Sequence, residues 1–140
     1  MTKITRWRQG RGYTPPSRMT NESAETAPFD PVAIEKLRAV AGDQGESFVK
    51  EMAQLFLDET TKSLAELGKA SDQGEWKVVT RAAHSLKSSA ATLGLLRLSS
   101  ACKALELDTK GANATPRTRE LVQAVLDEFE AAKPTLKSLS

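Results

Sequence analysis

Three side chains that could do chemistry lie within five consecutive residues. His84, the single histidine of the chain, is followed by Lys87 and Ser88. If this stretch is helical, the three share one face, because residues three and four apart are neighbours on a helix. Imidazole titrates near physiological pH, so such a histidine can carry acid–base or group-acceptor chemistry, or it can be an ordinary surface residue.

The residues around His84 are mostly alanine and serine. Small side chains clear space for another molecule to approach a polar group. They also allow two helices to pack closely. Composition alone therefore leaves a functional and a structural interpretation of His84 open.

Helical patterns that could position these residues begin at Asp30. Asp30 and Pro31 are typical of an N-cap and a first helical residue, and they open a short helix that stops at Gly42. Asp43 with Glu46 then forms a capping-box pattern at the start of a long helix. This helix is expected to end near residues 68–70 and to bury Phe48, Met52, Leu55, Phe56, Leu64 and Leu67.

The helix that carries His84 is predicted from a second capping-box pattern, Asp72 with Glu75, to a turn at Gly94. Its narrow apolar seam places His84 at the edge of the core with access to solvent. The seam consists of Val79, Ala82 or Ala83, Leu86, Ala90 and Leu93.

Two further helices complete the pattern. The first stops at Gly111, and the second is capped by Thr115-Pro116 and is kinked or ended by Pro134. Their inward residues are Leu95, Leu98, Cys102 and Leu105, then Leu121, Val122, Val125 and Phe129. We predict an all-α fold, an antiparallel four-helix bundle with a short additional N-terminal helix across one end.

Glu106 is expected to lie level with His84 across the Gly94 turn. His84 to Gly94 descends about 15 Å at 1.5 Å per residue, and the next helix climbs the same distance by Leu105 and Glu106. Glu106 could then accept a hydrogen bond from one imidazole nitrogen and leave the other unprotonated and outward. The alternative is a solvated carboxylate on a helix face.

Length and composition fit a single domain with one core. No apolar run could span a bilayer and no signal peptide is evident, so a cytoplasmic location is expected. Cys102 is the single cysteine, which excludes an internal disulfide and, with one histidine, makes a structural zinc site implausible.

Residues 1–28 differ from the body. They carry a net charge of +3 against −1 for residues 29–140, contain Gly and Pro, and are predicted to be a disordered basic tail. Its scattered arginines are not expected to bind nucleic acid or membrane strongly. Met19 is an alternative natural start, in which case the preceding residues are an upstream extension. The starting Met and the extra tail favour a free-standing chain over one cut from a larger hybrid kinase.

The stretch AHSLKSSAATLGLLRLSSACKALE resembles the signature of the histidine-containing phosphotransfer (HPt) domain of two-component phosphorelays. The histidine, lysine, small residue and glycine fall at the family's spacing. The resemblance covers residues 29–140, matching the four-helix bundle, and leaves the tail outside.

The resemblance implies a role for each matching residue. His84 would accept a phosphoryl group from a receiver-domain aspartate and pass it to another receiver domain, while Glu106 orients the imidazole. Lys87 would neutralise phosphoryl charge. Ser88 stands where the family often has glycine, and its hydroxyl could donate to phosphoryl oxygens.

The resemblance also implies the partners. These are response-regulator receiver domains and a hybrid sensor histidine kinase, with Mg²⁺ on the partner receiver and with no cofactor or metal of the chain's own. A monomeric phosphoryl carrier without kinase activity is expected. Docking is expected on the small-residue surface around His84, with contributions from Ile34, Leu37 and the start of the Phe48 helix.

Two other functions are alternatives to a phosphoryl carrier. A non-phosphorylated helical adaptor that binds receiver domains would retain its function in His84→Gln. A hydrolase with His84 as general base lacks a credible nucleophile, because Cys102 lies on an inward seam and no oxyanion hole is indicated.

Overall fold

The computed structural model describes residues 29–111 and 113–139, and all its regular elements are helical. The predicted tail, residues 1–28, lies outside the described residues, so its disorder and its boundary at residue 28 stay predictions. The elements are α2 (Pro31–Ala41), the 3-10 turn η1 (Gly42–Gln44), α3 (Gly45–Asp72), α4 (Trp76–Thr92), α5 (Leu96–Thr109) and α6 (Thr118–Leu139).

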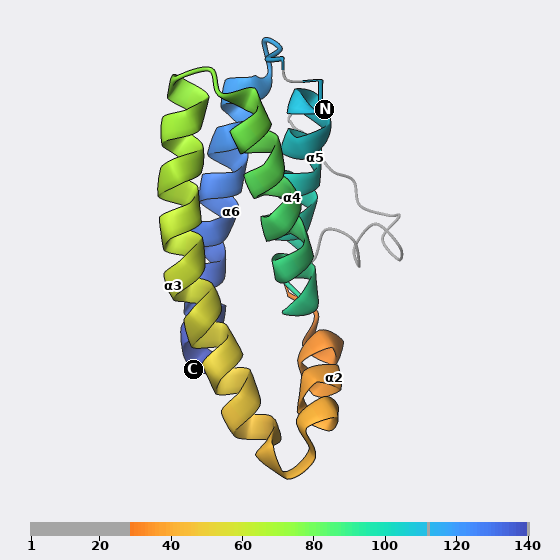
Figure 1. Ribbon diagram of the computed structural model, residues 1–140. Helices are drawn as coiled ribbons and strands as arrows, with labels where there is room; N and C mark the ends of the chain where they lie inside the picture. The colour runs from red at the N-terminus through yellow and green to blue at the C-terminus, as the bar shows by residue number, and fades with distance from the viewer. Residues whose placement is uncertain (1–28, 112, 140) are drawn as a thin grey trace, which may run out of the picture.

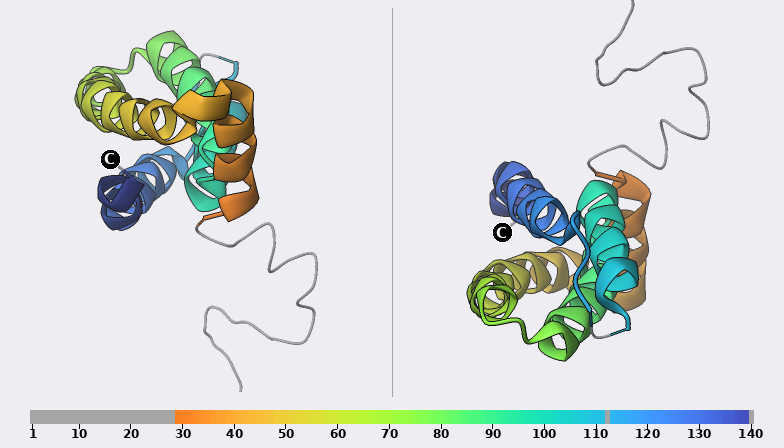
Figure 2. Two further views of the ribbon diagram at one scale, coloured as in Figure 1. Left: turned by 90° about the horizontal axis from the view of Figure 1, so that it is seen from below. Right: turned by 90° about the horizontal axis from the view of Figure 1, so that it is seen from above.

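The four long helices form an up-down-up-down bundle, which confirms the predicted fold (Figure 1). Seen end-on, α3, α4, α5 and α6 surround one core, and α2 lies outside this square (Figure 2). Each helix contributes one apolar stripe, so four stripes close the core without a sheet. Phe56 of α3 and Phe129 of α6 meet edge to face inside it, with ring centroids 6.3 Å apart.

The short helix α2 is fixed at the end of the bundle where α4 turns into α5. Asp30 caps α2 as predicted, its Oδ1 accepting from the Val32 N–H at 3.0 Å. The Asp30 N–H also donates to the Gly94 carbonyl at 2.7 Å. Gly94 has φ +77°, a conformation that favours glycine, and this lets the turn pass directly against the start of α2.

Both predicted capping boxes are wrong. Asp43 falls in η1, which leads from α2 to α3 through Gln44 at φ −95° and ψ 14°. An N-cap side chain needs an extended backbone to reach the first free N–H groups, and η1 provides none. Asp72 is the last residue of α3, and α4 starts after Glu75; in the described chain no side chain caps the start of α3 or α4.

The end predicted for the long helix is also wrong. The helix α3 continues through Gly68 to Asp72. Leu64, Leu67 and Ala70 are buried on both sides of Gly68, and this packing outweighs the cost of about 1 kcal/mol for a glycine inside a helix.

The seam of α3 lies partly in a different register from the predicted one. Leu55 is 56% exposed, whereas Leu57 is buried together with Val49 and Ala53. Phe56, Leu64 and Leu67 are buried as expected. Because the pattern FVKEMAQLFL contains apolar residues on more than one face, spacing alone does not decide which of them pack inward.

The last helix starts later than predicted and continues past Pro134, where a kink or an end was expected. Thr115 accepts from the Arg117 N–H at 3.1 Å, and α6 begins at Thr118. Pro134 does not end the helix, because α6 continues to Leu139 with Leu136 fully buried. The stabilisation gained by packing that last turn therefore outweighs the cost of the helical hydrogen bond that proline cannot make.

No helix in residues 29–111 or 113–139 combines the length and the apolar character that a bilayer crossing requires.

Candidate functional site

The helix α4 presents His84 at the rim of the core. Val79, Leu86 and Ala90 are buried along its inner face as predicted, and of the alternatives Ala82 and Ala83 it is Ala83 that is fully buried. His84 follows Ala83 in the chain and therefore points about a quarter-turn away from that seam. Its side chain is 62% exposed, so the imidazole is open to an approaching molecule.

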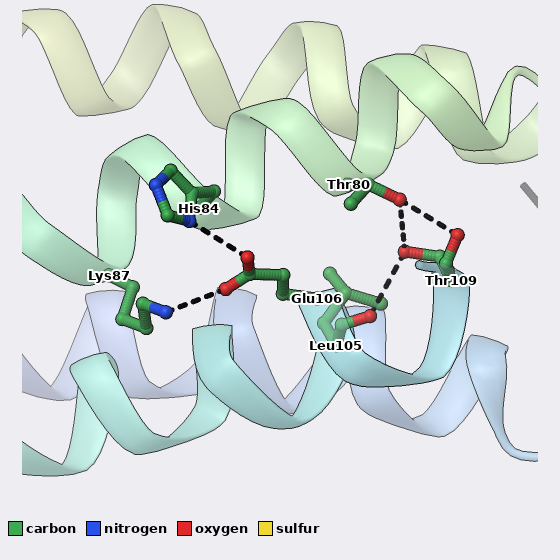
Figure 3. Close-up of polar contacts among 6 residues, drawn as sticks. All are labelled: Thr80, His84, Lys87, Leu105, Glu106 and Thr109. Atoms are coloured by element: carbon green, nitrogen blue, oxygen red, sulfur yellow. Dashed lines mark hydrogen bonds and ion pairs between the residues drawn. The ribbon is translucent and has the colours of Figure 1, made fainter. Parts of the chain in front are cut away.

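Glu106 lies level with His84 on the neighbouring helix, as the rise along the two helices predicted. Cys102, Leu105 and Thr109 bury the inner face of α5 and fix its rotation. Glu106 Oε2 is 2.8 Å from His84 Nδ1 (Figure 3). An ionised carboxylate only accepts hydrogen bonds, so Nδ1 carries the hydrogen and the neutral ring leaves a lone pair on Nε2.

Lys87 contacts the same carboxylate, a contact that the sequence patterns did not predict. Its Nζ donates to Glu106 Oε1 at 2.8 Å (Figure 3). Lys87 lies one turn beyond His84, about 4.5 Å along the axis, so a glutamate level with His84 is also within reach of a lysine. The same argument from helix rise that placed Glu106 opposite His84 could therefore have predicted the ion pair between Lys87 and Glu106.

Glu106 is held ionised by these two neighbours. The hydrogen bond from Lys87 is the main cause that lowers its pKa below the ordinary value of 4.5. Burial acts in the opposite direction, since the side chain is only 16% exposed, and the hydrogen bond with His84 lowers the pKa further. The carboxylate therefore stays an acceptor throughout the physiological range.

Ser88 shares the face of His84 but not its hydrogen bonds. It is exposed one turn beyond His84. Within the described residues, no hydrogen bond links its hydroxyl to His84, Lys87 or Glu106. Ser88 thus leaves open surface next to the imidazole.

The small residues of α4 face two directions. Ser85 and Ser89 line a groove between α3 and α4, together with Met52 and the exposed Leu55. Ser88 lies outside this groove, on the side of His84.

One docking residue expected from the sequence is misplaced. Ile34 is 2% exposed, because it packs inward from α2, and it offers no docking surface. Leu37 and Phe48 are half-buried.

The described residues contain no group of three or more His, Cys, Asp or Glu side chains that could hold a metal ion.

The site presents an exposed imidazole. A carboxylate sets the orientation and tautomer of this ring, and the carboxylate is itself paired with a lysine.

Comparison with known proteins identifies a family and a solved structure that this chain resembles. A family model described as the Hpt domain matches residues 51–133. The fold is similar to the crystal structure of histidine-containing phosphotransfer protein B (HptB) from Pseudomonas aeruginosa PAO1, with a TM-score of 0.70 and 21% sequence identity over 80% of this chain and 93% of that chain. No curated protein sequence matches the chain.

Proposed function

Since the chain belongs to the Hpt domain family, its role is histidine phosphotransfer in two-component signalling, and we propose that His84 is the residue that carries the phosphoryl group. His84 accepts the group from the aspartyl phosphate of one receiver domain and passes it to the aspartate of another. A hybrid sensor histidine kinase supplies the phosphoryl group at the start of the relay. The chain is a monomeric carrier and is not itself a kinase.

The observation that carries this proposal is the contact between Glu106 Oε2 and His84 Nδ1. It directs the unprotonated Nε2 away from α5, on a side chain that is 62% exposed. A phosphoryl acceptor needs an accessible lone pair aligned with the bond that breaks, and a ring fixed at one nitrogen meets that need better than a freely rotating one.

The transfer step balances without any group from a third molecule. The Nε2 lone pair attacks phosphorus in line, the N–P bond forms, and the P–O bond to the aspartate breaks, releasing a carboxylate. The ring becomes cationic while Nδ1 keeps its hydrogen, and the Glu106 carboxylate stabilises that positive charge. Transfer to the next receiver reverses these bond changes.

Lys87 is proposed to reduce the repulsion between Glu106 and the incoming phosphoryl group. One hydrogen of its ammonium group binds Glu106 Oε1. An ammonium group has three donors, so Lys87 can also donate to a phosphoryl oxygen. This extends the role expected from the sequence, because the lysine balances the carboxylate before the phosphoryl group arrives.

The remaining catalytic parts are assigned to the partner. Phosphoryl transfer is accelerated mainly by positioning and by cations that neutralise developing charge. We place Mg²⁺ on the receiver domain. Ser88, a small residue beside the imidazole, leaves room for the receiver's phosphoaspartate to reach Nε2 and offers a hydroxyl to its oxygens.

The decisive experiment uses a receiver domain carrying a labelled aspartyl phosphate. Wild type is expected to acquire acid-labile, base-stable label, and His84→Gln is expected to acquire none while keeping the same helical circular dichroism. Label on His84→Gln, or none on wild type with several receivers, contradicts the proposal. Equal receiver binding by both chains without any label would identify an adaptor instead.

A second experiment tests Lys87. Lys87→Ala is expected to slow transfer about tenfold, the loss of roughly 1.4 kcal/mol of charge stabilisation, with unchanged helicity. Lys133→Ala is the matched control, because Lys133 also forms an ion pair with a glutamate, Glu130, but on α6 and outside the His84 site. Equal rates for Lys87→Ala and wild type would remove the proposed role of the ammonium group.

A further inference from the structure

Two threonine hydroxyls meet across the α4–α5 interface about one turn from the His84 site. Thr80 Oγ1 lies 2.7 Å from Thr109 Oγ1 and 2.9 Å from the Thr109 carbonyl oxygen (Figure 3). Each hydroxyl is also within reach of a carbonyl of its own helix, Thr80 of Trp76 at 2.8 Å and Thr109 of Leu105 at 3.0 Å. Thr109 is fully buried and Thr80 is half-buried.

The Thr80 hydroxyl binds a backbone group, the Thr109 carbonyl, that has no hydrogen-bond partner within α5. Thr109 is the last residue of α5, and the last four carbonyls of a helix have no partner within it. Since Thr109 is buried, a partner must come from the neighbouring helix, and the Thr80 hydroxyl is the one in place. The contact therefore ties the end of α5 to one level of α4.

The contact between Thr80 and Thr109 is close enough to the site to fix the position of Glu106 along α5 relative to His84 on α4. Thr80 is one turn before His84, about 6 Å along α4, and Thr109 is three residues beyond Glu106, about 4.5 Å along α5. At the other side of the site the Ser99 hydroxyl donates to the Lys87 carbonyl at 3.0 Å. Hydroxyl contacts between α4 and α5 thus lie on both sides of the contact between His84 and Glu106.

The rest of the interface does not fix the axial position as sharply. The buried faces of α4 and α5 consist mainly of Ala, Val and Leu, and apolar contacts are non-directional. A hydrogen bond needs a donor–acceptor distance of about 2.7–3.2 Å and a nearly linear geometry, so the 2.8 Å contact between Glu106 and Nδ1 depends on how α5 is placed against α4.

We infer that Thr80 and Thr109 are positioning residues, whose hydroxyl pair holds α4 and α5 in the register that puts Glu106 against His84 Nδ1. They touch no substrate and act through Glu106. The inference rests on the proposed function of His84 for its effect on transfer. The effect on the imidazole itself does not depend on that function.

The test compares valine and serine at both positions, because valine keeps the shape of threonine and removes the hydroxyl, whereas serine retains it. Nitrogen-15 NMR of the His84 ring above its titration range reports which nitrogen carries the hydrogen. We expect wild type, Thr80→Ser and Thr109→Ser to hold the Nδ1–H form. We expect Thr80→Val and Thr109→Val to lose its predominance and to accept phosphoryl about tenfold more slowly.

The matched control is Thr61→Val, which removes a threonine hydroxyl bonded to the Leu57 carbonyl within α3. It is expected to leave the ring unchanged. Wild-type ring spectra in both valine variants would overturn the inference, as would equal changes in Thr61→Val. If Thr109→Val does not fold, Thr80→Val at the half-buried position decides.

The two proposals fail in different ways. If wild type holds the Nδ1–H form but accepts no phosphoryl group, the proposed function is wrong and the positioning role stands. If wild type accepts phosphoryl while the valine variants keep the wild-type ring spectrum and rate, the positioning role is wrong and the function stands.

Discussion

At the scale of single residues, the site depends on one carboxylate that serves two neighbours. The two oxygens of Glu106 contact different groups, Oε1 the Lys87 ammonium and Oε2 the His84 ring. A neutral amide at this position could still accept from His84, but it would not balance the lysine or a cationic imidazole. The negative charge of Glu106 is therefore the feature to test.

Glu106→Gln is expected to reduce the free energy of unfolding by about 1 kcal/mol at pH 7. The folded-state pKa of Glu106 is lowered, so its contribution is present above the ordinary carboxyl pKa and is lost as the pH falls through the lowered value. The difference between wild type and variant should therefore vanish in strong acid. Denaturant unfolding across a pH series measures it.

The control is Glu130→Gln, in an exposed pair with Lys133 on α6. This change should alter stability by less than about 0.5 kcal/mol at pH 7. A Glu106→Gln difference that persists undiminished well below pH 4 would show that the charge of Glu106 is not its source.

At the scale of elements, two glycines with positive φ have different roles. Gly42 ends α2 at φ +57°, and a Cβ added there would have no atom within 4 Å. Gly94 joins α4 to α5 at φ +77°, next to the start of α2. A Cβ on Gly94 would collide with the Asp30 carbonyl oxygen and come within 3.0 Å of the Ala33 Cβ. Of these two glycines, only Gly94 therefore combines a backbone requirement with a close approach.

Gly94→Ala is expected to cost more than about 2 kcal/mol, because backbone strain adds to the collision with α2. Gly42→Ala, which carries backbone strain at φ +57° and ψ −121° but meets no neighbouring atom, should cost less than Gly94→Ala, about 1–2 kcal/mol. Chemical denaturation of both variants measures the difference. Equal losses would mean that α2 moves away from Gly94 without cost.

At the scale of the whole molecule, the core encloses the one thiol completely. Cys102 is 0% exposed on the inner face of α5. Burial is the main cause that raises its thiol pKa from 9.0 to about 12, and the nearby Glu106 charge adds to the effect while Lys87 opposes it. The thiol is thus shielded both sterically and by its protonation.

Thiol labelling at pH 8 should consequently report opening of the bundle. With a pKa of about 12, roughly one thiol in ten thousand is ionised at that pH, and the thiolate is the reactive form. Native chain is expected to react with a disulfide reagent orders of magnitude more slowly than chain in concentrated guanidinium. Comparable rates in the two conditions would mean that Cys102 is accessible in the folded state.

Local sequence patterns were sufficient to predict the features that repeat along one helix or follow from its constant rise. The seam of Val79, Leu86, Ala90 and Leu93 is confirmed because a period of 3.6 residues is a local property, whereas packing decided between Ala82 and Ala83. Glu106 was placed opposite His84 because two helices of equal rise on either side of a tight turn return to the same level.

The ends of the helices and the partners of the polar side chains depend instead on how the helices pack together. Asp43 and Asp72 carry capping signals, but the path of the chain through η1 and the packing of α3 deny them the backbone geometry of a cap. The Lys87–Glu106 pair and the Thr80–Thr109 contact depend on distances between two helices. No local pattern encodes such distances, because they are set by how the side chains of the whole core fill space.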